Sequence, residues 1–502
     1  MKKDISVIKN SKQFERIFRS IQQCKTTSDV ESKLNSIDQD ESTNSLYDEL
    51  GIDLFKIFTS MQKSTTVSNF DRKLLRQSAL LAHYDIDYAL KFFEYYREAA
   101  KNKSVSWIRC QRIENALINT KHHIEQHKKQ NRKIVTIHPY LEQNLPNNKF
   151  NSIEEFKEKS TEMFEPCLVT ISKNTSPQNK TVYRLSTADD YDLFDKKCIA
   201  ELNVRNTLTY KYLALKNVCV SCEPSGIIFK DKGEYKYLYS ANGIYHHFRI
   251  CGKTVLKDNP LKLDEAFMIP RKGENNYFHS VIDVLPNYLA YKILDLDCPI
   301  VISHKLSEID KVVIKKLKIP LNRIIETEKN GVEVTSALVP MSVSFLDDFI
   351  RMMREYSIKK CAGKYPLISN KKKIYISRIK SGTRTMINED KVEEVMKSAA
   401  FEIVYMEEHT LEEQMAIMSS ADLIVGPHGA GLTNMVYANS GSKILELIPS
   451  RYLTPMFRQL AVNCGHKYGV IIGETHSGST SDKGEFLWSI DIEKLKIVLK
   501  EL

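Results

Sequence analysis

Residues 421–448 read ADLIVGPHGAGLTNMVYANSGSKILELI, and this stretch decides how the C-terminal part of the chain folds. The apolar run 423–425 stops at a Gly-Pro pair, as a buried parallel strand does where it enters a turn. A glycine-containing loop follows, then a short helical segment over 432–438 and a second buried strand over 443–448. The stretch therefore predicts a β-α-β unit whose glycines lie at the first turn.

The glycines of this turn let a ligand approach the backbone closely. Gly429 and Gly431 have no Cβ, so backbone N–H groups can face a bound group, and the helix that follows adds its unpaired N-terminal donors. Anionic or hydroxyl-rich ligands suit such a turn. The spacing matches neither the dinucleotide fingerprint nor a Walker loop. A tight turn around a buried, hydrogen-bonded His428 is the competing interpretation.

The segment GPHGAGLTNMVYANSGSKILELIP closely resembles the signature of glycosyltransferase family 61. Further matches are ENNYFHSVIDVLPNYLAYK from Glu274, and YISR followed by Arg384 and Asn388-Glu389. A third match is LEEQMAIMSSAD, directly before the strand at 423–425. The resemblance covers about residues 215–502. It implies an α/β protein of the GT-B type, in which two Rossmann-like, doubly wound domains face a cleft.

The same resemblance implies an inverting glycosyltransferase that uses a UDP-sugar as its donor. The family includes protein O-linked N-acetylglucosamine transferases and plant xylosyltransferases, so N-acetylglucosamine and xylose-like donors are both compatible. The expected partners are therefore a nucleotide sugar and a glycan or lipid-linked acceptor. Two alternatives remain: another GT-B-like transferase that modifies glycans, and a noncatalytic scaffold that binds sugar nucleotides or glycans.

Composition sets looser bounds. The chain has 502 residues, which favours two or three domains. Its net charge of +10, from 73 basic and 63 acidic residues, does not choose among phosphorylated ligands, nucleic acid and an anionic membrane surface. The ten cysteines are expected to be reduced thiols. Cys219 and Cys222 form one CxxC without a second half, so we assign them to a strand and expect no metal site there.

No stretch of about 18 apolar residues is present, and charged residues interrupt the start of the chain. We therefore expect a cytoplasmic protein. Eukaryotic members of the family work in the secretory pathway behind a membrane anchor, which we do not find in this sequence. This difference favours a bacterial enzyme of surface polysaccharide synthesis, with peripheral contact at the inner face of the membrane as an option. We expect no nucleic-acid partner.

The pattern along the chain predicts four regions. Residues 1–135 form a mainly helical N-terminal region, and 136–210 form a linker or irregular subdomain that contains several prolines. Residues 211–365 form the first Rossmann-like domain, on the acceptor side. Residues 366–502 form the second, which binds the nucleotide sugar and ends in closing helices.

Alternating apolar patterns predict the elements of the two domains. In the first domain, the expected strands are 218–220, 226–229, 235–239, 299–303 and 323–326, with further strands near 332 and 338, and the expected helices are 276–295 (despite Pro286), 308–317 and 347–362. In the second domain, strands are expected at 373–377 and 401–405 before the β-α-β unit, and helices at 389–399, 411–419, 457–464 and 490–499.

Two arginines are candidates for binding a diphosphate. Arg378 directly follows the strand 373–377, and Arg384 comes a short turn later, so both lie beyond the carboxyl end of a strand, where open α/β sheets bind ligands. Guanidinium groups match phosphate oxygens with paired donors. No convincing DxD motif offers a metal site, so we expect a reaction without a metal or other cofactor. A solvent-exposed basic turn is the competing interpretation.

His279 and Asp283 are candidates for the general base. They lie four residues apart on one predicted helix and so share a face. A carboxylate beside an imidazole can hold it in one tautomer and keep it basic, as a base acting near neutral pH requires. The pattern does not decide which of the two is the base. Simple packing at the start of the helix is the competing interpretation.

The remaining candidates surround the glycine turn. We expect His428, Gly429, Ala430 and Gly431 to contact the sugar or phosphates of the donor, with Asn434 as a secondary contact. Glu446 lies inside the strand 443–448, where a carboxylate needs a partner. It is expected to bind ribose hydroxyls. A structural, hydrogen-bonded glutamate is the alternative.

Overall fold

The structure is a computed structural model, and it describes the chain in stretches. The described residues are 86–87, 90, 115, 117–119, 121–122, 124–126, 128–130, 133–140, 146–159, 167–173, 183–184, 190, 194, 208–220, 227–231, 233–238, 253–256, 259–269, 276–303, 305–327, 331–341, 345–361, 372–381, 384–476 and 487–502. Most of the predicted N-terminal helical region lies outside these residues, but the described positions between 86 and 129 are helical.

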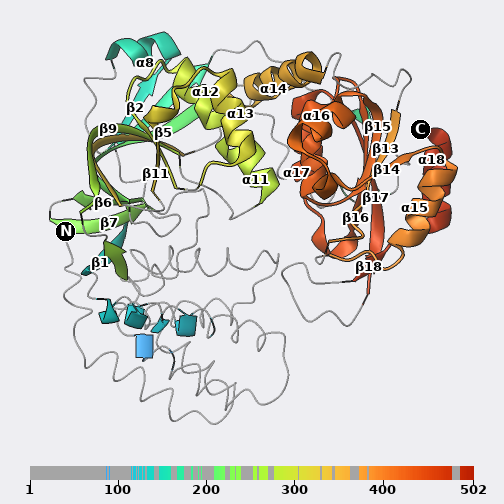
Figure 1. Ribbon diagram of the computed structural model, residues 1–502, viewed down its shortest axis with the longest axis horizontal. Coiled ribbons are helices and arrows are strands. Elements are labelled where there is room, and N and C mark those ends of the chain that lie inside the picture. The colour runs from blue at the N-terminus through green and yellow to red at the C-terminus, as the bar shows by residue number, and fades with distance from the viewer. Residues whose placement is uncertain are drawn as a thin grey trace.

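The described part of the chain is built around two sheets (Figure 1). The larger sheet has the order β11-β10-β9-β12-β5-β6-β7-β1-β8, with β3 paired to β5 and β2 paired to β3. Its strands are β1 (Lys133–Tyr140), β2 (Asn147–Phe150), β3 (Cys167–Lys173), β5 (Leu208–Val220), β6 (Ile227–Asp231), β7 (Glu234–Leu238), β8 (Lys253–Leu256), β9 (Leu261–Ile269), β10 (Ile300–Ile302), β11 (Ile324–Glu326) and β12 (Val332–Pro340).

The larger sheet is mixed, which corrects the expectation of a doubly wound parallel sheet in the first domain. The run β11-β10-β9-β12 is parallel, as are the pairs β1-β7 and β2-β3, whereas β12, β5, β6 and β7 pair in antiparallel fashion. The physical reason is the length of the connections, because a parallel pair needs a crossover of a dozen or more residues. β6 and β7 are separated by two residues, and the second is Gly233 with φ 86°, as a tight hairpin requires.

Strands β1 to β3 come from the neighbourhood of the expected linker 136–210, yet they pair within the larger sheet. That segment is therefore part of the sheet rather than a simple connector. The two strands expected near 332 and 338 form one continuous strand, β12. The division into four domains stays a prediction.

The smaller sheet is the doubly wound parallel sheet expected for the second domain. Its order is β14-β13-β15-β16-β17-β18, parallel from β14 to β17, with β18 antiparallel and β4 parallel to β17. The strands are β4 (Tyr183–Arg184), β13 (Lys372–Ile376), β14 (Glu402–Val404), β15 (Ala421–Pro427), β16 (Lys443–Pro449), β17 (Lys467–Thr475) and β18 (Trp488–Ser489). The chain order reverses between β13 and β15, so a ligand crevice is expected at their carboxyl ends.

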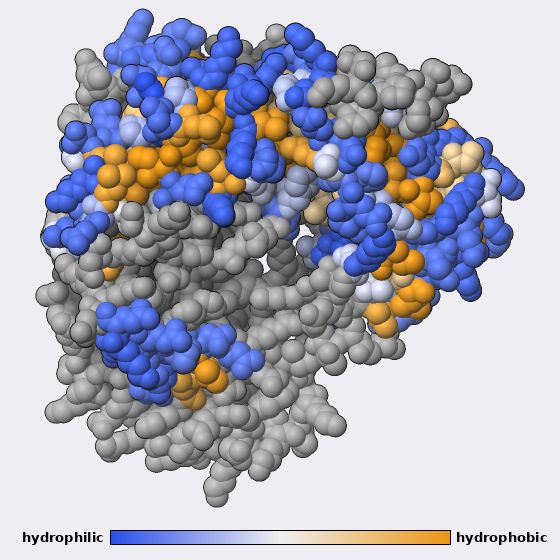
Figure 2. Space-filling view, in the orientation of Figure 1, coloured by the Kyte–Doolittle hydropathy of each residue, from blue (hydrophilic) through white to orange (hydrophobic). Residues whose placement is uncertain are grey.

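Helices cover both faces of the smaller sheet (Figure 1). Along β15, Ile424 packs with α16 (Leu411–Ser419) and α17 (Met456–Cys464), while Leu423 and Val425 pack with α15 (Glu389–Ser398) and α18 (Ile492–Glu501). Alternate residues of a strand point to opposite faces, so this apolar run contributes side chains to the cores on both faces of the sheet. In Figure 2 the region around α15 and α18 is largely hydrophilic, as expected for helices with one face in solvent.

The predicted helix over 276–295 is interrupted by a wider turn. It consists of α11 (Tyr277–His279), the π-helical turn η6 (Ser280–Val284) and α12 (Pro286–Ile293). Pro286 has no N–H, which suits the first position of α12. The preceding N–H, of Leu285, reaches back to the carbonyl of Ser280. The segment therefore passes the proline without ending the helical path.

Helix α14 (Leu346–Cys361) joins the two sheets into one body. The Arg354 Nη2 donates to the carbonyl of Cys464 at 2.7 Å, and the Ser357 hydroxyl donates to the carbonyl of Met415 at 3.0 Å. One apolar cluster includes residues from both sheets. Figure 1 shows α14 and α11 between the two sheets.

Among the described helices, none is both long and apolar enough to span a bilayer.

Candidate active site

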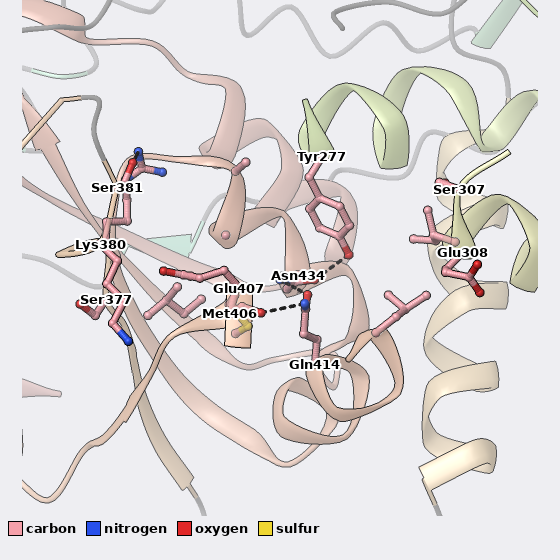
Figure 3. Close-up of a pocket in the computed structure, with 16 residues that line it drawn as sticks. Tyr277, Ser307, Glu308, Ser377, Lys380, Ser381, Met406, Glu407, Gln414 and Asn434 are labelled. Atoms are coloured by element: carbon pink, nitrogen blue, oxygen red, sulfur yellow. Dashed lines mark hydrogen bonds between the residues drawn. The ribbon is translucent and has the colours of Figure 1, made fainter. Parts of the chain in front are cut away.

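A cavity of about 600 Å³ lies where the two sheets meet (Figure 3). One wall is Tyr277 of α11 and residues 307–309, at the start of α13 (Glu308–Lys316). The opposite wall is formed by residues that follow β13, β14 and β15. It therefore opens at the carboxyl ends of the strands that flank the reversal of chain order, the place where open α/β sheets bind ligands.

Arg378 lines this cavity at the end of β13. Its backbone N–H donates to the Glu389 carboxylate at 2.7 Å, and its Nη2 donates to the Ser381 hydroxyl at 2.8 Å. The guanidinium lies directly over Gly429, where an added methyl group would come within 2.6 Å of the arginine Cζ. Gly429 thus serves here by its lack of a side chain. Burial, followed by the charge of Arg384, lowers the pKa of Arg378 to about 10.

Arg384 is the second cation of this group. Its Cζ lies 5.6 Å from the centre of the Tyr452 ring, and burial lowers its pKa. Its Nε is buried and has no hydrogen-bond partner within the described stretches. Two guanidinium groups that are partly buried near each other repel, and an anion relieves both the repulsion and the cost of burial. The pair therefore suits a phosphate or diphosphate ligand.

Glu389, at the first turn of α15, accepts a hydrogen bond from the backbone N–H of Arg378. Besides the Arg378 N–H, its Oε1 accepts hydrogen bonds from the hydroxyls of Tyr375 at 3.1 Å and Ser377 at 3.4 Å. The side chain is buried, and this burial raises the pKa of the carboxyl. The carboxylate ties the strand end to the helix that covers it, so it orients the arginine through the backbone.

His279 and Asp283 form a pair in α11 and η6. The imidazole Nδ1 lies 2.6 Å from Oδ2 of Asp283, and both side chains are partly exposed. The two residues therefore share a face as expected. They lie outside the lining of the 600 Å³ cavity, to which this helical segment contributes Tyr277. Their role as base stays a prediction.

A polar chain crosses the cavity wall between the two sheets (Figure 3). The Tyr277 hydroxyl donates to Oδ1 of Asn434 at 2.7 Å, and Asn434 Nδ2 donates to Oε1 of Gln414 at 3.2 Å. Gln414 in turn donates to the carbonyls of Met406 and His409. Asn434 lines the cavity, and its contact with the donor stays a prediction. Tyr277 and Gln414 were not candidates, because nothing local in the sequence shows that they meet.

His428 and Glu446 lie in the interior beside the cavity. His428 is 4% exposed, and its Nδ1 lies 2.5 Å from Oε1 of Glu446. The other carboxylate oxygen of Glu446, a residue with no exposed surface, accepts from the Tyr468 hydroxyl. Glu446 therefore faces His428 and Tyr468 rather than the cavity, as the structural interpretation of this residue requires. Ala430 and Gly431 do line the cavity.

Two aromatic rings pack against the imidazole of His428. The rings of Tyr452 and Phe457 meet it edge to face, with centroids at 5.2 and 5.1 Å. Phe457 also contacts Phe278, the neighbour of His279. Contacts between Phe278 and Phe457 thus connect His279 of α11 with His428, which follows β15. Among the described residues, no three His, Cys, Asp or Glu side chains gather in a way that would hold a metal ion.

Residues 277–445 match the family model Glycosyltransferase 61. This region is a glycosyltransferase 61 domain. It contains the cavity wall from Tyr277 to Asn434, both arginines and the glycine turn, whereas Glu446, Tyr452 and β18 lie beyond it.

Two rice proteins show similarity to the chain. Beta-1,2-xylosyltransferase RCN11 of Oryza sativa subsp. japonica is 43% identical over 47 residues, which is 9% of this chain and 9% of that protein. Alpha-1,3-arabinosyltransferase XAT3 of the same plant is 29% identical over 124 residues, 23% of this chain and 21% of that protein. The matched segments thus span about a tenth and a fifth of these relatives.

Proposed function

We propose that the protein is an inverting glycosyltransferase that moves a sugar from a UDP-sugar to a hydroxyl of a glycan or lipid-linked acceptor. The observation that carries this proposal is the partly buried pair Arg378 and Arg384, one of which lines the cavity at the carboxyl end of β13. A nucleoside diphosphate is both the anion that the two charges suit and the leaving group of the reaction. The glycosyltransferase 61 domain supports the same assignment.

We propose a GT-B arrangement, with the donor held by the smaller sheet and the acceptor entering from the larger one. The parallel order of β14 to β17 and the location of the cavity between the sheets support it. Ala430 and Gly431 then lie against the phosphates or sugar, and Asn434 braces the wall through Tyr277. His428 orients the turn from the interior, fixed by Glu446.

The proposed reaction is a single displacement. The acceptor oxygen attacks the anomeric carbon from the side opposite to UDP, the bond to the diphosphate breaks, and the configuration inverts. Arg378 and Arg384 balance the charge that develops on the diphosphate, so no metal ion is needed. His279, held by Asp283, or Asp283 itself takes the proton from the acceptor hydroxyl. Exclusion of water from the cavity when both substrates fill it protects the donor from hydrolysis.

We further propose an N-acetylglucosamine or xylose-like donor and a role in bacterial surface polysaccharide synthesis on the cytoplasmic side of the membrane. The names of the rice relatives, a xylosyltransferase and an arabinosyltransferase, support a pentose as one donor to test. The donor panel therefore includes UDP-xylose, UDP-arabinose and UDP-N-acetylglucosamine.

The test is release of UDP from this panel in the presence and absence of EDTA. We expect slow hydrolysis of one donor, unaffected by EDTA, and at least a tenfold loss in Arg378→Ala, since a charge-assisted contact contributes about 1.5–3 kcal/mol. Arg351→Ala is the matched control, because Arg351 is exposed, lies outside the cavity lining and, within the described part of the chain, bonds Asp348 on the same helix. Binding of UDP-sugars without turnover on any acceptor would instead support a noncatalytic scaffold. Loss of activity in EDTA would contradict the metal-free step.

A further inference from the structure

Building on this proposed function, we propose that Trp488 is a positioning residue of the diphosphate site. It lies on β18, outside the glycosyltransferase 61 domain, and 104 positions from Arg384 in the sequence. Its task is to hold the backbone of Arg384 so that the guanidinium stays beside Arg378. Trp488 does not touch the substrate in this proposal.

Three hydrogen bonds join this one residue to the segment that carries Arg384. The indole Nε1–H donates to the carbonyl of Arg384 at 2.8 Å. The backbone N–H of Trp488 donates to the carbonyl of Thr385 at 3.1 Å, and its carbonyl accepts from the N–H of Ile387 at 2.8 Å. Asn388 extends the contact by exchanging hydrogen bonds with the backbone of Ile490. Residues 384–388 are therefore hydrogen-bonded to residues 488–490 at several points.

Arg384 needs such support because its backbone is unfavourable. Its φ is 52°, in the left-handed region that residues with a side chain rarely adopt. Conformations of this kind persist where the surroundings fix them, often at functional sites. The indole bond is made to the carbonyl of this same residue, so it acts at the strained position itself.

Among the residues that the structure describes, no acidic group holds the side chain of Arg384. Among the described residues, its contacts are the face of Tyr452 at 5.6 Å and the repulsive charge of Arg378, and its Nε is buried without a partner. An arginine held by a carboxylate would keep its location after a small backbone change, but Arg384 would not. Its guanidinium therefore depends on the backbone anchor until an anion binds.

The indole itself is held rigidly by the neighbouring strand. Trp488 is 1% exposed, and its ring lies against Gly473 of β17, where an added methyl group would come within 2.6 Å of the indole Cε3. The close approach fixes the direction of the Nε1–H bond. This geometry makes Gly473 a second place from which the anchor can be disturbed.

The experiment compares binding of UDP and of uridine by calorimetry. Trp488→Phe keeps an aromatic ring and removes the N–H donor, so we expect about a tenfold loss of affinity for UDP and none for uridine, which has no phosphate. In Arg384→Gln the same change should cost nothing further, because the group that Trp488 positions is already absent. Leu487→Ala, an exposed neighbour on the same segment, is the matched control and should bind UDP as the parent does.

Two further measurements keep the inference testable if Trp488→Phe does not fold. Gly473→Ala adds a methyl group that would come within 2.5 Å of the Ser489 carbonyl and 2.6 Å of the indole, so it displaces β18 together with the indole and should give the same UDP-selective loss. In the unaltered protein, the indole N–H resonance of Trp488, assigned with Trp107→Phe, should shift on addition of UDP and stay in place with uridine. Equal losses for UDP and uridine, a full additive effect in Arg384→Gln, or an unmoved resonance would overturn the role of Trp488. A parent protein that binds UDP no better than uridine would overturn the proposed function itself.

Discussion

At the scale of single residues, the site depends on one close contact between an arginine and a glycine. The guanidinium of Arg378 occupies the space that a side chain at residue 429 would fill. The glycine is therefore needed for the arginine to reach the cavity, and its backbone angle of φ 170° is open to any residue. Steric exclusion, rather than backbone freedom, is the reason for glycine here.

Gly429→Ala should consequently displace Arg378 and lower the affinity for UDP by about tenfold or more, since a charged contact to phosphate is lost. The measurement is calorimetric titration with UDP. The control is the same change in an Arg378→Ala background, where we expect no additional loss. Independent losses from the two changes would show that Gly429 acts in some other way.

His279 and Asp283 should affect turnover without affecting binding of the donor, because they lie outside the cavity lining. We expect His279→Gln to lower kcat by about 100-fold or more, the usual range for loss of a general base, with an unchanged Kd for UDP. Asp283→Asn separates the two assignments. If His279 is the base, this variant retains part of the activity and its pH profile moves, whereas a base at Asp283 makes Asp283→Asn the more damaging change.

At the scale of elements, the site lies at the carboxyl ends of the neighbouring strands β13 and β15, beside the start of α15. Both strands end at the cavity, and the first turn of α15 supplies Glu389 to the backbone of Arg378. The element order of a doubly wound sheet thus places a cation, a glycine turn and a helix start together.

Glu389→Ala should therefore lower both stability and UDP affinity. It leaves the Arg378 N–H and the Tyr375 hydroxyl without their acceptor in the interior, which costs about 1–3 kcal/mol for each unsatisfied group. Glu389→Gln keeps an acceptor oxygen and should recover a large part of both losses. Thermal unfolding and UDP titration of the two variants measure this, and equal damage in both would show that the charge matters rather than the hydrogen bonds.

At the scale of the whole molecule, one apolar core and helix α14 hold the two sheets together. His466 lies in this region, 2% exposed, with its Nε2 2.9 Å from the carbonyl of Met435. Burial lowers the pKa of His466 to about 4, so the imidazole is neutral in the folded protein at neutral pH.

This depressed pKa predicts acid sensitivity. The unfolded chain takes up a proton near the usual pKa of about 6.5 and the folded protein only near pH 4, so the contribution of His466 is complete above pH 6.5 and is lost as the pH falls to 4. The expected slope is at most about 1.4 kcal/mol per pH unit. Denaturant unfolding of the parent and of His466→Gln from pH 7 to pH 4 should show a flatter dependence in the variant. Parallel curves would contradict the assignment.

Local pattern predicted much of the smaller sheet and supplied candidates for the site. Strands β13 to β16 and helices α15 to α17 were expected from short apolar runs, because each is specified by neighbours in the chain. Arg378 became a candidate because it directly follows such a strand, and it does line the cavity. Strand β17 was overlooked, although its run of Val470, Ile471 and Ile472 is the β-branched signal of a buried strand.

By itself, then, the amino-acid sequence determined a strand-helix-strand unit with a glycine turn, arginines after a strand and a histidine-carboxylate pair on one helical face, although the helix of this unit is the 3₁₀ segment Ala430–Tyr437 rather than an α-helix. Only the tertiary structure decided the mixed pairing of the larger sheet, the interior location of Glu446 against His428 and Tyr468, and the bond from Trp488 to Arg384. The reason is sequence distance. Helical spacing and turns arise between near neighbours, whereas strand pairing and buried partners depend on how remote segments pack once the core forms.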